Sequence, residues 1–147
     1  DFTGETMDFP IEEFSEEGGP LWMIQFEDWD DPREDPFTSS SFALLLNAKH
    51  PDCPRKVNGQ MVNEPLLLEI LCEAYFLLYE KVRCFHDDSV WDDMISDSNL
   101  TPDSICSVLF WFSQRGDDLF NWSTPESRML SIKKIVDQSF SGGGVDE

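Results

Sequence analysis

Basic side chains are scarce in this sequence. Lys and Arg together number 10 against 30 Asp and Glu, which gives a formal net charge of −20 at pH 7. Such an excess of negative charge keeps a protein in solution and repels the phosphates of DNA, RNA and anionic membranes. We therefore expect no direct binding to nucleic acid or to a membrane, and we expect a protein partner with a basic surface.

Long apolar runs are missing as well. No apolar run reaches the roughly 20 residues that span a bilayer, and the acidic N-terminus lacks the features of a signal peptide. Of the four cysteines, Cys72 and Cys106 fall within apolar helical patterns, where cysteine behaves as a small hydrophobe. These patterns favour reduced thiols and an intracellular protein, in the cytoplasm or the nucleus, over a secreted one.

Motifs for catalysis are few. The chain has two His, no Gly-x-Ser-x-Gly and no Gly-rich loop that opens a helix, since the triple glycine at 142–144 comes at the end of the sequence. We therefore expect no enzymatic activity. A small metal- or thiol-dependent enzyme is the least favoured of the alternatives.

Large apolar side chains, in contrast, are plentiful. The 147 residues fit one domain of ordinary size, and 12 Phe and 5 Trp are enough to build a core. Residues 1–38 hold 13 carboxylates and one Arg, so the negative charge is concentrated at one end. We divide the chain into an acidic N-terminal segment (1–37) packed partly on the core, a helical core domain (38–141) and a flexible tail (142–147).

The dominant pattern in the core domain is helical. Residues 66–85 are apolar over most of a helix circumference, which predicts a central rod surrounded by other elements. Capping signals and apolar periodicity predict shorter helices around it. These begin near Thr38, Ser89, Thr101 and Thr124, and the first of them includes Phe42 to Asn47 and ends at Pro51. The sequence thus predicts a mainly α fold, a compact bundle of four or five helices.

Two short segments favour β structure. Residues 21–29 are rich in aromatic and β-branched side chains between turn residues, which is typical of a short strand or of an amphipathic segment that docks on a partner. In residues 55–62, Asn58-Gly59 lies between two short arms. This pair is typical of a type I′ hairpin turn, because both central residues need a positive φ.

Two short segments together contain two Cys and two His, which is a complete set of zinc ligands. His50 and Cys53 precede the predicted hairpin, and Cys84 and His86 follow the long helix. Two Cys and two His form a tetrahedral zinc site in many small domains, although a single residue between Cys84 and His86 is not the usual spacing. A zinc-stabilised regulatory or adaptor domain is therefore one alternative, with zinc as the only cofactor considered.

Acidic side chains interleaved with aromatic ones indicate a binding surface. In such surfaces aromatic side chains anchor in apolar pockets, and carboxylates steer the protein toward a basic rim. The candidate partner-binding residues are Trp22, Phe26, Trp29, Asp30, Asp31, Asp87, Asp88, Trp91, Asp92 and Asp93.

The favoured interpretation is an acidic protein-interaction module that binds a basic partner surface. In composition alone, a charge of −20 on a compact body is similar to that of proteins that imitate the phosphate array of nucleic acid and block basic clefts. That similarity extends the interpretation to an inhibitor or a nucleic-acid mimic.

Overall fold

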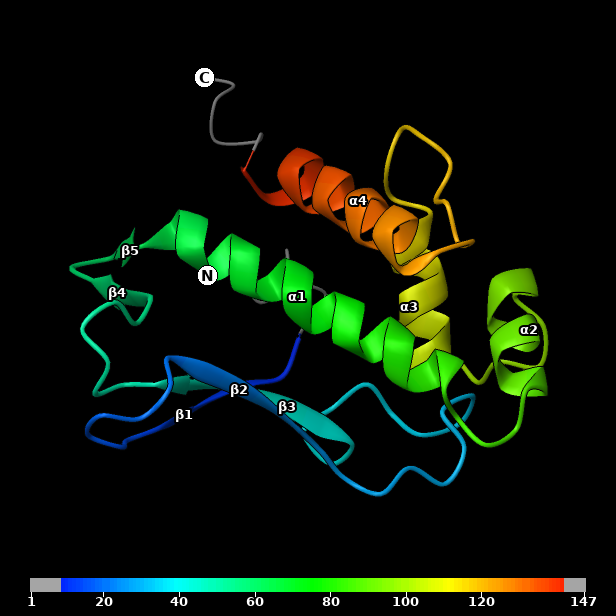
Figure 1. Cartoon of the computed structure of the whole chain (residues 1–147), viewed down its shortest axis with the longest axis horizontal. Coiled ribbons are helices and arrows are strands. Elements are labelled where there is room, and N and C mark those ends of the chain that lie inside the picture. The colour runs from blue at the N-terminus through cyan, green and yellow to red at the C-terminus, as the bar shows by residue number, and fades with distance from the viewer. Residues whose placement is uncertain (1–8, 142–147) are drawn as a thin grey trace.

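The structure, a computed structural model, describes residues 9–141 and places a small sheet against a group of helices (Figure 1). The tail predicted for residues 142–147 lies outside the described residues. In chain order the elements are β1 (Ile11–Phe14), β2 (Trp22–Phe26), β3 (Phe42–Asn47), β4 (Arg55–Val57), β5 (Gln60–Val62), α1 (Glu64–Arg83), α2 (Ser89–Ser96), α3 (Ile105–Ser113), α4 (Pro125–Val136) and the π-helical turn η1 (Asp137–Ser141).

The main sheet has three strands in the order β1-β3-β2. The middle strand β3 pairs with β1 in parallel and with β2 antiparallel, so that Leu44 lies opposite Ile11 on one side and Ile24 on the other. In Figure 1, α1 lies between this sheet and α4, while α2 and α3 lie near the C-terminal end of α1.

The prediction of a mainly α bundle is wrong. The described chain is 40% helical and 18% strand, with a three-stranded mixed sheet and a two-stranded sheet, and is therefore a mixed α/β fold. The prediction fails because residues 42–47 form the middle strand and not a helix. It also missed β1, whose four residues include two exposed glutamates and show no regular alternation of apolar and polar side chains.

The physical reason for the error lies in the burial of β3. Five of its six residues are buried and the sixth is half-buried, so the strand is covered on both faces. An apolar run of this length does not distinguish a buried strand from a buried helix by periodicity, and its shortness favours a strand. The polar residues before it form a turn and not a helix cap, since the Ser41 N–H donates to the Thr38 carbonyl at 2.9 Å.

The two predicted β segments are confirmed. In β2 the side chains alternate between half-buried and exposed, as the pattern of a half-buried strand requires. In the hairpin of β4 and β5, Asn58 and Gly59 have φ values of 54° and 81°, which are the positive angles of a type I′ turn.

The long helix and the three helices after it are confirmed, with different caps in two places. Ser104, and not Thr101, caps α3 by accepting from the Ser107 N–H. Asn63 before α1 makes no side-chain cap. Thr124 caps α4 as predicted, in a reciprocal capping box with Ser127. Among helices within residues 9–141, none has the length and apolar character needed to cross a bilayer.

Aromatic rings join the acidic N-terminal segment to the helices. The ring of Phe9, 2% exposed, lies edge-on to Phe37, Phe42 and Tyr75 at centroid distances of 5.6, 5.4 and 5.0 Å. The Tyr75 ring in turn stacks on Phe112 of α3 at 4.0 Å. One core therefore includes the segment before β1, the sheet, α1 and α3.

Candidate acidic binding face

Two segments far apart in the sequence form one acidic face. Residues 27–36 lie in the connection from β2 to β3, and residues 87–93 include the end of the loop after α1 and the first five residues of α2. Arg33 of the first segment reaches the second, with Nη1 2.6 Å from Asp93 Oδ2 and Nη2 3.6 Å from Asp87 Oδ2. We call the surface formed by these two segments the acidic face.

Arg33 also binds a carboxylate of its own segment. Its Nε and Nη2 lie 3.0 Å from Oδ1 and Oδ2 of Asp31, a bidentate arrangement. Hydrogen bonding to this guanidinium holds the pKa of the Asp31 carboxyl below its usual range, and the carboxylates of Asp31 and Asp93 raise the pKa of Arg33. The pKa of Asp87 is lowered as well, chiefly by hydrogen bonds from Ser89. The Asp31 and Asp87 carboxylates are thus ionised at neutral pH, and their hydrogen bonds hold them in position.

The pairing leaves most of the negative charge on the surface. The two segments contain ten carboxylates and one basic side chain, so that Arg33 compensates only a tenth of their charge. Asp30, Asp88 and Asp92 are exposed, and no residue between 9 and 141 hydrogen-bonds to their carboxylates or pairs with them. The chemistry of this face is that of exposed anions on two segments that Arg33 holds together.

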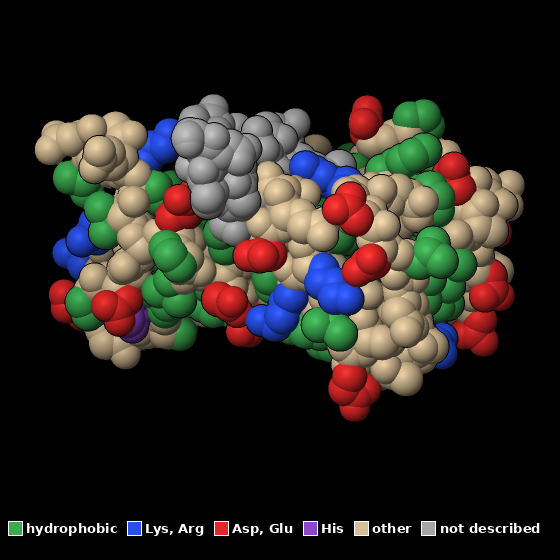
Figure 2. All heavy atoms as spheres, turned by 90° about the horizontal axis from the view of Figure 1, so that it is seen from above, with side chains coloured by type: hydrophobic (Ala, Val, Ile, Leu, Met, Phe, Trp, Pro, Cys, Tyr) green, Lys and Arg blue, Asp and Glu red, His purple; other side chains and the backbone are tan. Residues whose placement is uncertain are grey.

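The face that carries α4 is different. Lys133 Nζ lies 2.9 Å from Glu69 Oε1, and Lys134 Nζ lies 3.3 Å from Asp118 Oδ2. Figure 2, which looks at that side of the molecule, shows Lys and Arg side chains beside Asp and Glu. Lys and Arg side chains there pair with part of the negative charge, whereas Arg33 is the one basic side chain in the two segments of the acidic face.

The aromatic members of the predicted binding set point inward. Trp91 is only 8% exposed and belongs to the core. Trp29 is half-buried, and its indole Nε1–H donates to the Ser41 carbonyl at 3.0 Å. Trp22 and Phe26 of β2 also pack against the core. The structure therefore separates the predicted set into aromatic side chains that pack in or against the core and carboxylates that are mostly exposed to solvent.

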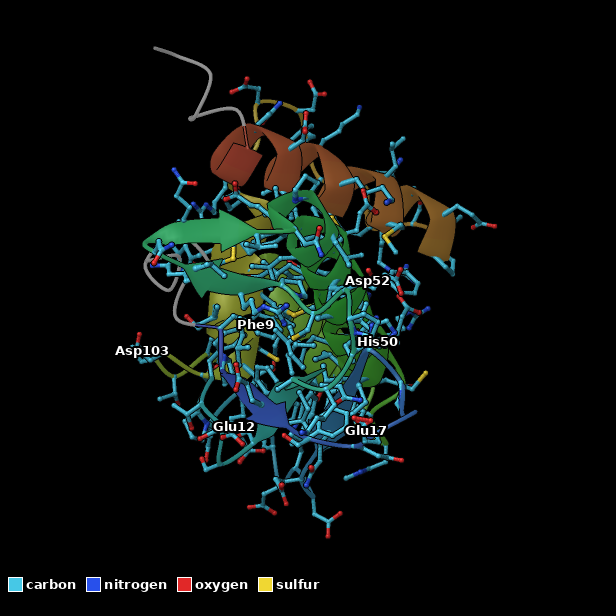
Figure 3. The ribbon with its side chains drawn as sticks, turned by 90° about the vertical axis from the view of Figure 1, so that its left-hand side faces the viewer. Phe9, Glu12, Glu17, His50, Asp52 and Asp103 are labelled. Carbon is cyan, nitrogen blue, oxygen red and sulfur yellow. The ribbon has the colours of Figure 1, made fainter. Side chains whose placement is uncertain are left out.

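The first half of the predicted zinc set lies near the N-terminal end of α1. His50 is in the turn after β3, where its Nδ1 accepts from the Asp52 N–H, and Cys53 is 2% exposed. The Asn63 amide, just before α1, donates to the Asp52 carbonyl at 3.0 Å and ties this turn to the helix. Figure 3 views the molecule from this end, with His50 and Asp52 labelled.

The second half lies at the other end of the same helix. Cys84 is the C-cap of α1, and His86 follows in the loop to α2. A helix of 20 residues is about 30 Å long, whereas zinc ligands lie about 2 Å from the ion. The structure does not bring the four predicted ligands together. Within residues 9–141 there is no group of three or more His, Cys, Asp or Glu side chains that could hold a metal ion.

Sequence reasoning missed the residue that organises the face. Arg33 is the one basic residue among the first 38 and has acidic neighbours on both sides. A single basic side chain among many carboxylates is attracted to the position where most of them gather, so the sequence could have identified Arg33 as the residue that pairs with several carboxylates. The sequence could not show that the second group of carboxylates would come from residues 87–93.

The lowered pKa of Asp31 predicts how its contribution to stability depends on pH. Because its folded pKa lies below the unfolded value near 4, the carboxylate stabilises the fold above about pH 4 and loses this effect as the pH falls through the folded pKa. Asp31→Asn should therefore lower the free energy of unfolding by about 1 kcal/mol at pH 6 and by less near pH 2 to 3. Urea unfolding at the two pH values measures this difference. Asp30→Asn, which removes no ion pair, is the control, and an Asp31→Asn effect that is equal at both pH values would contradict the assignment.

The acidic face thus combines fixed carboxylates with buried aromatic supports. Its charge and geometry carry the functional argument, because comparisons of the chain with protein-family models, with curated proteins and with solved structures find no match.

Proposed function

We propose that the protein is an acidic interaction module whose acidic face binds a basic surface of a partner protein. The observation that carries the proposal is the set of exposed carboxylates of Asp30, Asp88 and Asp92, which pair with no residue between 9 and 141 and lie on the two segments that Arg33 joins. Arg33 fixes the two segments relative to each other but leaves their charge largely uncompensated.

Like charges held at short range repel one another, which costs the folded protein free energy. A partner that brings Lys or Arg side chains between them relieves this repulsion and gains charge-assisted hydrogen bonds. The long-range field also speeds the encounter with a basic partner and slows the encounter with an acidic one. Binding is therefore expected to be selective by charge and sensitive to salt.

A comparative pull-down tests the proposal. Three baits are compared. The first is the wild type, the second is the acidic-face variant with Asp30→Asn, Asp88→Asn and Asp92→Asn together, and the third is a control variant with Glu12→Gln, Glu13→Gln and Glu17→Gln. Both sets raise the net charge by the same amount. The control residues are exposed and lie around β1, at the opposite end of the long axis from α2 (Figures 1 and 3).

Wild-type and control baits should capture the same basic proteins from a lysate of the source cells, as identified by mass spectrometry, and the acidic-face variant should lose them. Capture of identical proteins by all three baits would show that the face is not the binding surface.

A further inference from the structure

A hollow of about 600 Å³ lies next to the acidic face, where α2 meets the end of α1 and the loop between α3 and α4. Its volume falls within the range of ligand-binding clefts, and most of its lining is apolar. The apolar lining residues are Trp91, Ile95, Leu119, Phe120 and Trp122. Arg83 supplies a charged side chain, with its guanidinium carbon 5.4 Å from the centre of the Trp91 ring.

Hydrogen bonds and contacts between aromatic rings hold the walls of this hollow in place. The buried Arg128 of α4 donates to the Trp122 carbonyl at 2.6 Å and to Glu80 Oε2 of α1 at 2.8 Å. The centroid of the Trp122 ring lies 4.6 Å from that of the Phe120 ring and 5.8 Å from that of the Trp91 ring. The hollow is therefore formed before any partner arrives, which lowers the entropic cost of binding.

Leu119, at the rim, is 96% exposed, the highest value among the exposed large apolar side chains of the described chain. It also lines a second hollow of about 190 Å³ that reaches Leu130 and Ile135 of α4. An apolar side chain between two hollows loses contact with water only when another molecule covers it. We call Leu119 and the two hollows beside it the Leu119 surface.

Carboxylates border the Leu119 surface on two sides. Trp91 and Ile95 of α2 line the larger hollow, whereas Asp88 and Asp92, just before and within the same helix, are exposed and belong to the acidic face. Asp117 lies in the lining of the smaller hollow together with the Asp118–Lys134 ion pair. Even with Lys134 and the Arg83 of the larger hollow counted, carboxylates are in excess around the Leu119 surface. An apolar centre with an acidic rim is complementary to apolar side chains flanked by Lys or Arg, and it is continuous with the face assigned to the basic partner.

We infer that the Leu119 surface receives the apolar side chains of an amphipathic basic segment of the partner, while its Lys and Arg side chains pair with Asp88 and Asp92. This inference rests on the proposed function, since it names the part of the basic partner that docks. The apolar contacts supply affinity that persists at high salt, and the carboxylates supply orientation and rate of encounter.

Two peptides of equal charge test the inference. Both are about 18 residues long, or five helical turns, with Lys on one face and either Leu or Ala on the other. Fluorescence anisotropy of the labelled peptides gives their dissociation constants for full-length protein. The wild type should bind the Leu peptide about tenfold more tightly than the Ala peptide, and Leu119→Ser should remove most of that preference.

Val57→Ser is the matched control, because Val57 is an exposed apolar residue of β4, at the far end of the molecule, and lines neither hollow. It should leave both affinities unchanged. If Leu119→Ser also leaves them unchanged, or if the wild type binds both peptides equally, the inference is overturned. A wild-type dimer that Leu119→Ser dissociates would also overturn it, and would assign the surface to a second copy of the chain.

Failure of the inference is distinguishable from failure of the proposed function. The triple variant Asp30→Asn, Asp88→Asn and Asp92→Asn should weaken the binding of both peptides. If it does so while Leu119→Ser has no effect, only the docking of apolar side chains is rejected. If the triple variant binds both peptides as the wild type does, the proposed function fails and the inference fails with it.

Discussion

Replacing Phe9 by alanine should lower the free energy of unfolding by about 4 kcal/mol, because a fully buried phenylalanine loses both its transfer free energy and its packing contacts. The Phe9 ring contacts three other aromatic rings of the core, and one of these belongs to α1. Only Pro10 separates Phe9 from β1, so the burial of Phe9 also fixes the start of that strand. Chemical denaturation of the purified variant measures the loss.

Leu130→Ala is the control for this experiment, since Leu130 is 55% exposed and its truncation should change the stability by less than about 0.5 kcal/mol. A Phe9→Ala protein that unfolds at the wild-type denaturant concentration would show that the acidic N-terminal segment does not belong to the core.

Replacing Arg128 by methionine should lower the free energy of unfolding by about 3 kcal/mol, the lower end of the cost of removing one partner from a buried ion pair, because Arg128 is buried whereas the Glu80 side chain is 26% exposed. Arg128 is 3% exposed and forms two hydrogen bonds to the Glu80 carboxylate and one to the Trp122 carbonyl. Its guanidinium also lies 5.4 Å from the centre of the Trp91 ring. Methionine replaces the apolar stem of the arginine side chain but not its guanidinium, so the effect reports mainly the lost charge and hydrogen bonds.

The matched control lies on the same helix. Lys133 forms an ion pair with Glu69 in which both side chains are largely exposed, and such pairs contribute about 0 to 1 kcal/mol. Lys133→Met should therefore have a small effect. Equal destabilisation by the two substitutions would contradict the structural role assigned to Arg128.

The sequence predicted best the elements that carry their own local signal. The Asn58-Gly59 pair requires a particular turn, and the apolar circumference of residues 66–85 requires a surrounded helix; both are found. For β3 and β1 the deciding information is the pairing between them, which is a contact between residues about thirty positions apart. No local pattern contains that information, and the helix predicted for residues 42–47 is the consequence.

The charged residues show a similar division. That carboxylates and aromatic side chains would share one region follows from their order in the chain. Which of them face solvent does not follow, as the burial of Trp91 shows. Arg128 carried a usable signal, because it lies four residues before Ile132, on the apolar side of α4. A basic residue in that position is expected to be buried against a carboxylate, here Glu80.

The zinc prediction relied on side-chain type and local spacing, and the fold decided against it by distance. His50 and Cys53 are close in sequence, as are Cys84 and His86, but α1 separates the two pairs by its whole length. Whether ligands from two segments can meet at one metal ion depends on the length and direction of the helix between them. That is a property of the tertiary structure, and a sequence pattern does not contain it.

The most direct measurement of the central claim is the salt dependence of the affinity for the partner captured by the wild-type protein. Screening shortens the Debye length from about 10 Å at 0.1 M salt to about 3 Å at 1 M, so interactions between exposed charges weaken strongly over this range. The affinity of the wild type should fall steeply with salt, and that of the variant with Asp30, Asp88 and Asp92 replaced by asparagine should be lower and fall less steeply. An affinity that is the same for both proteins and does not change with salt would contradict the assignment of the acidic face as the binding surface.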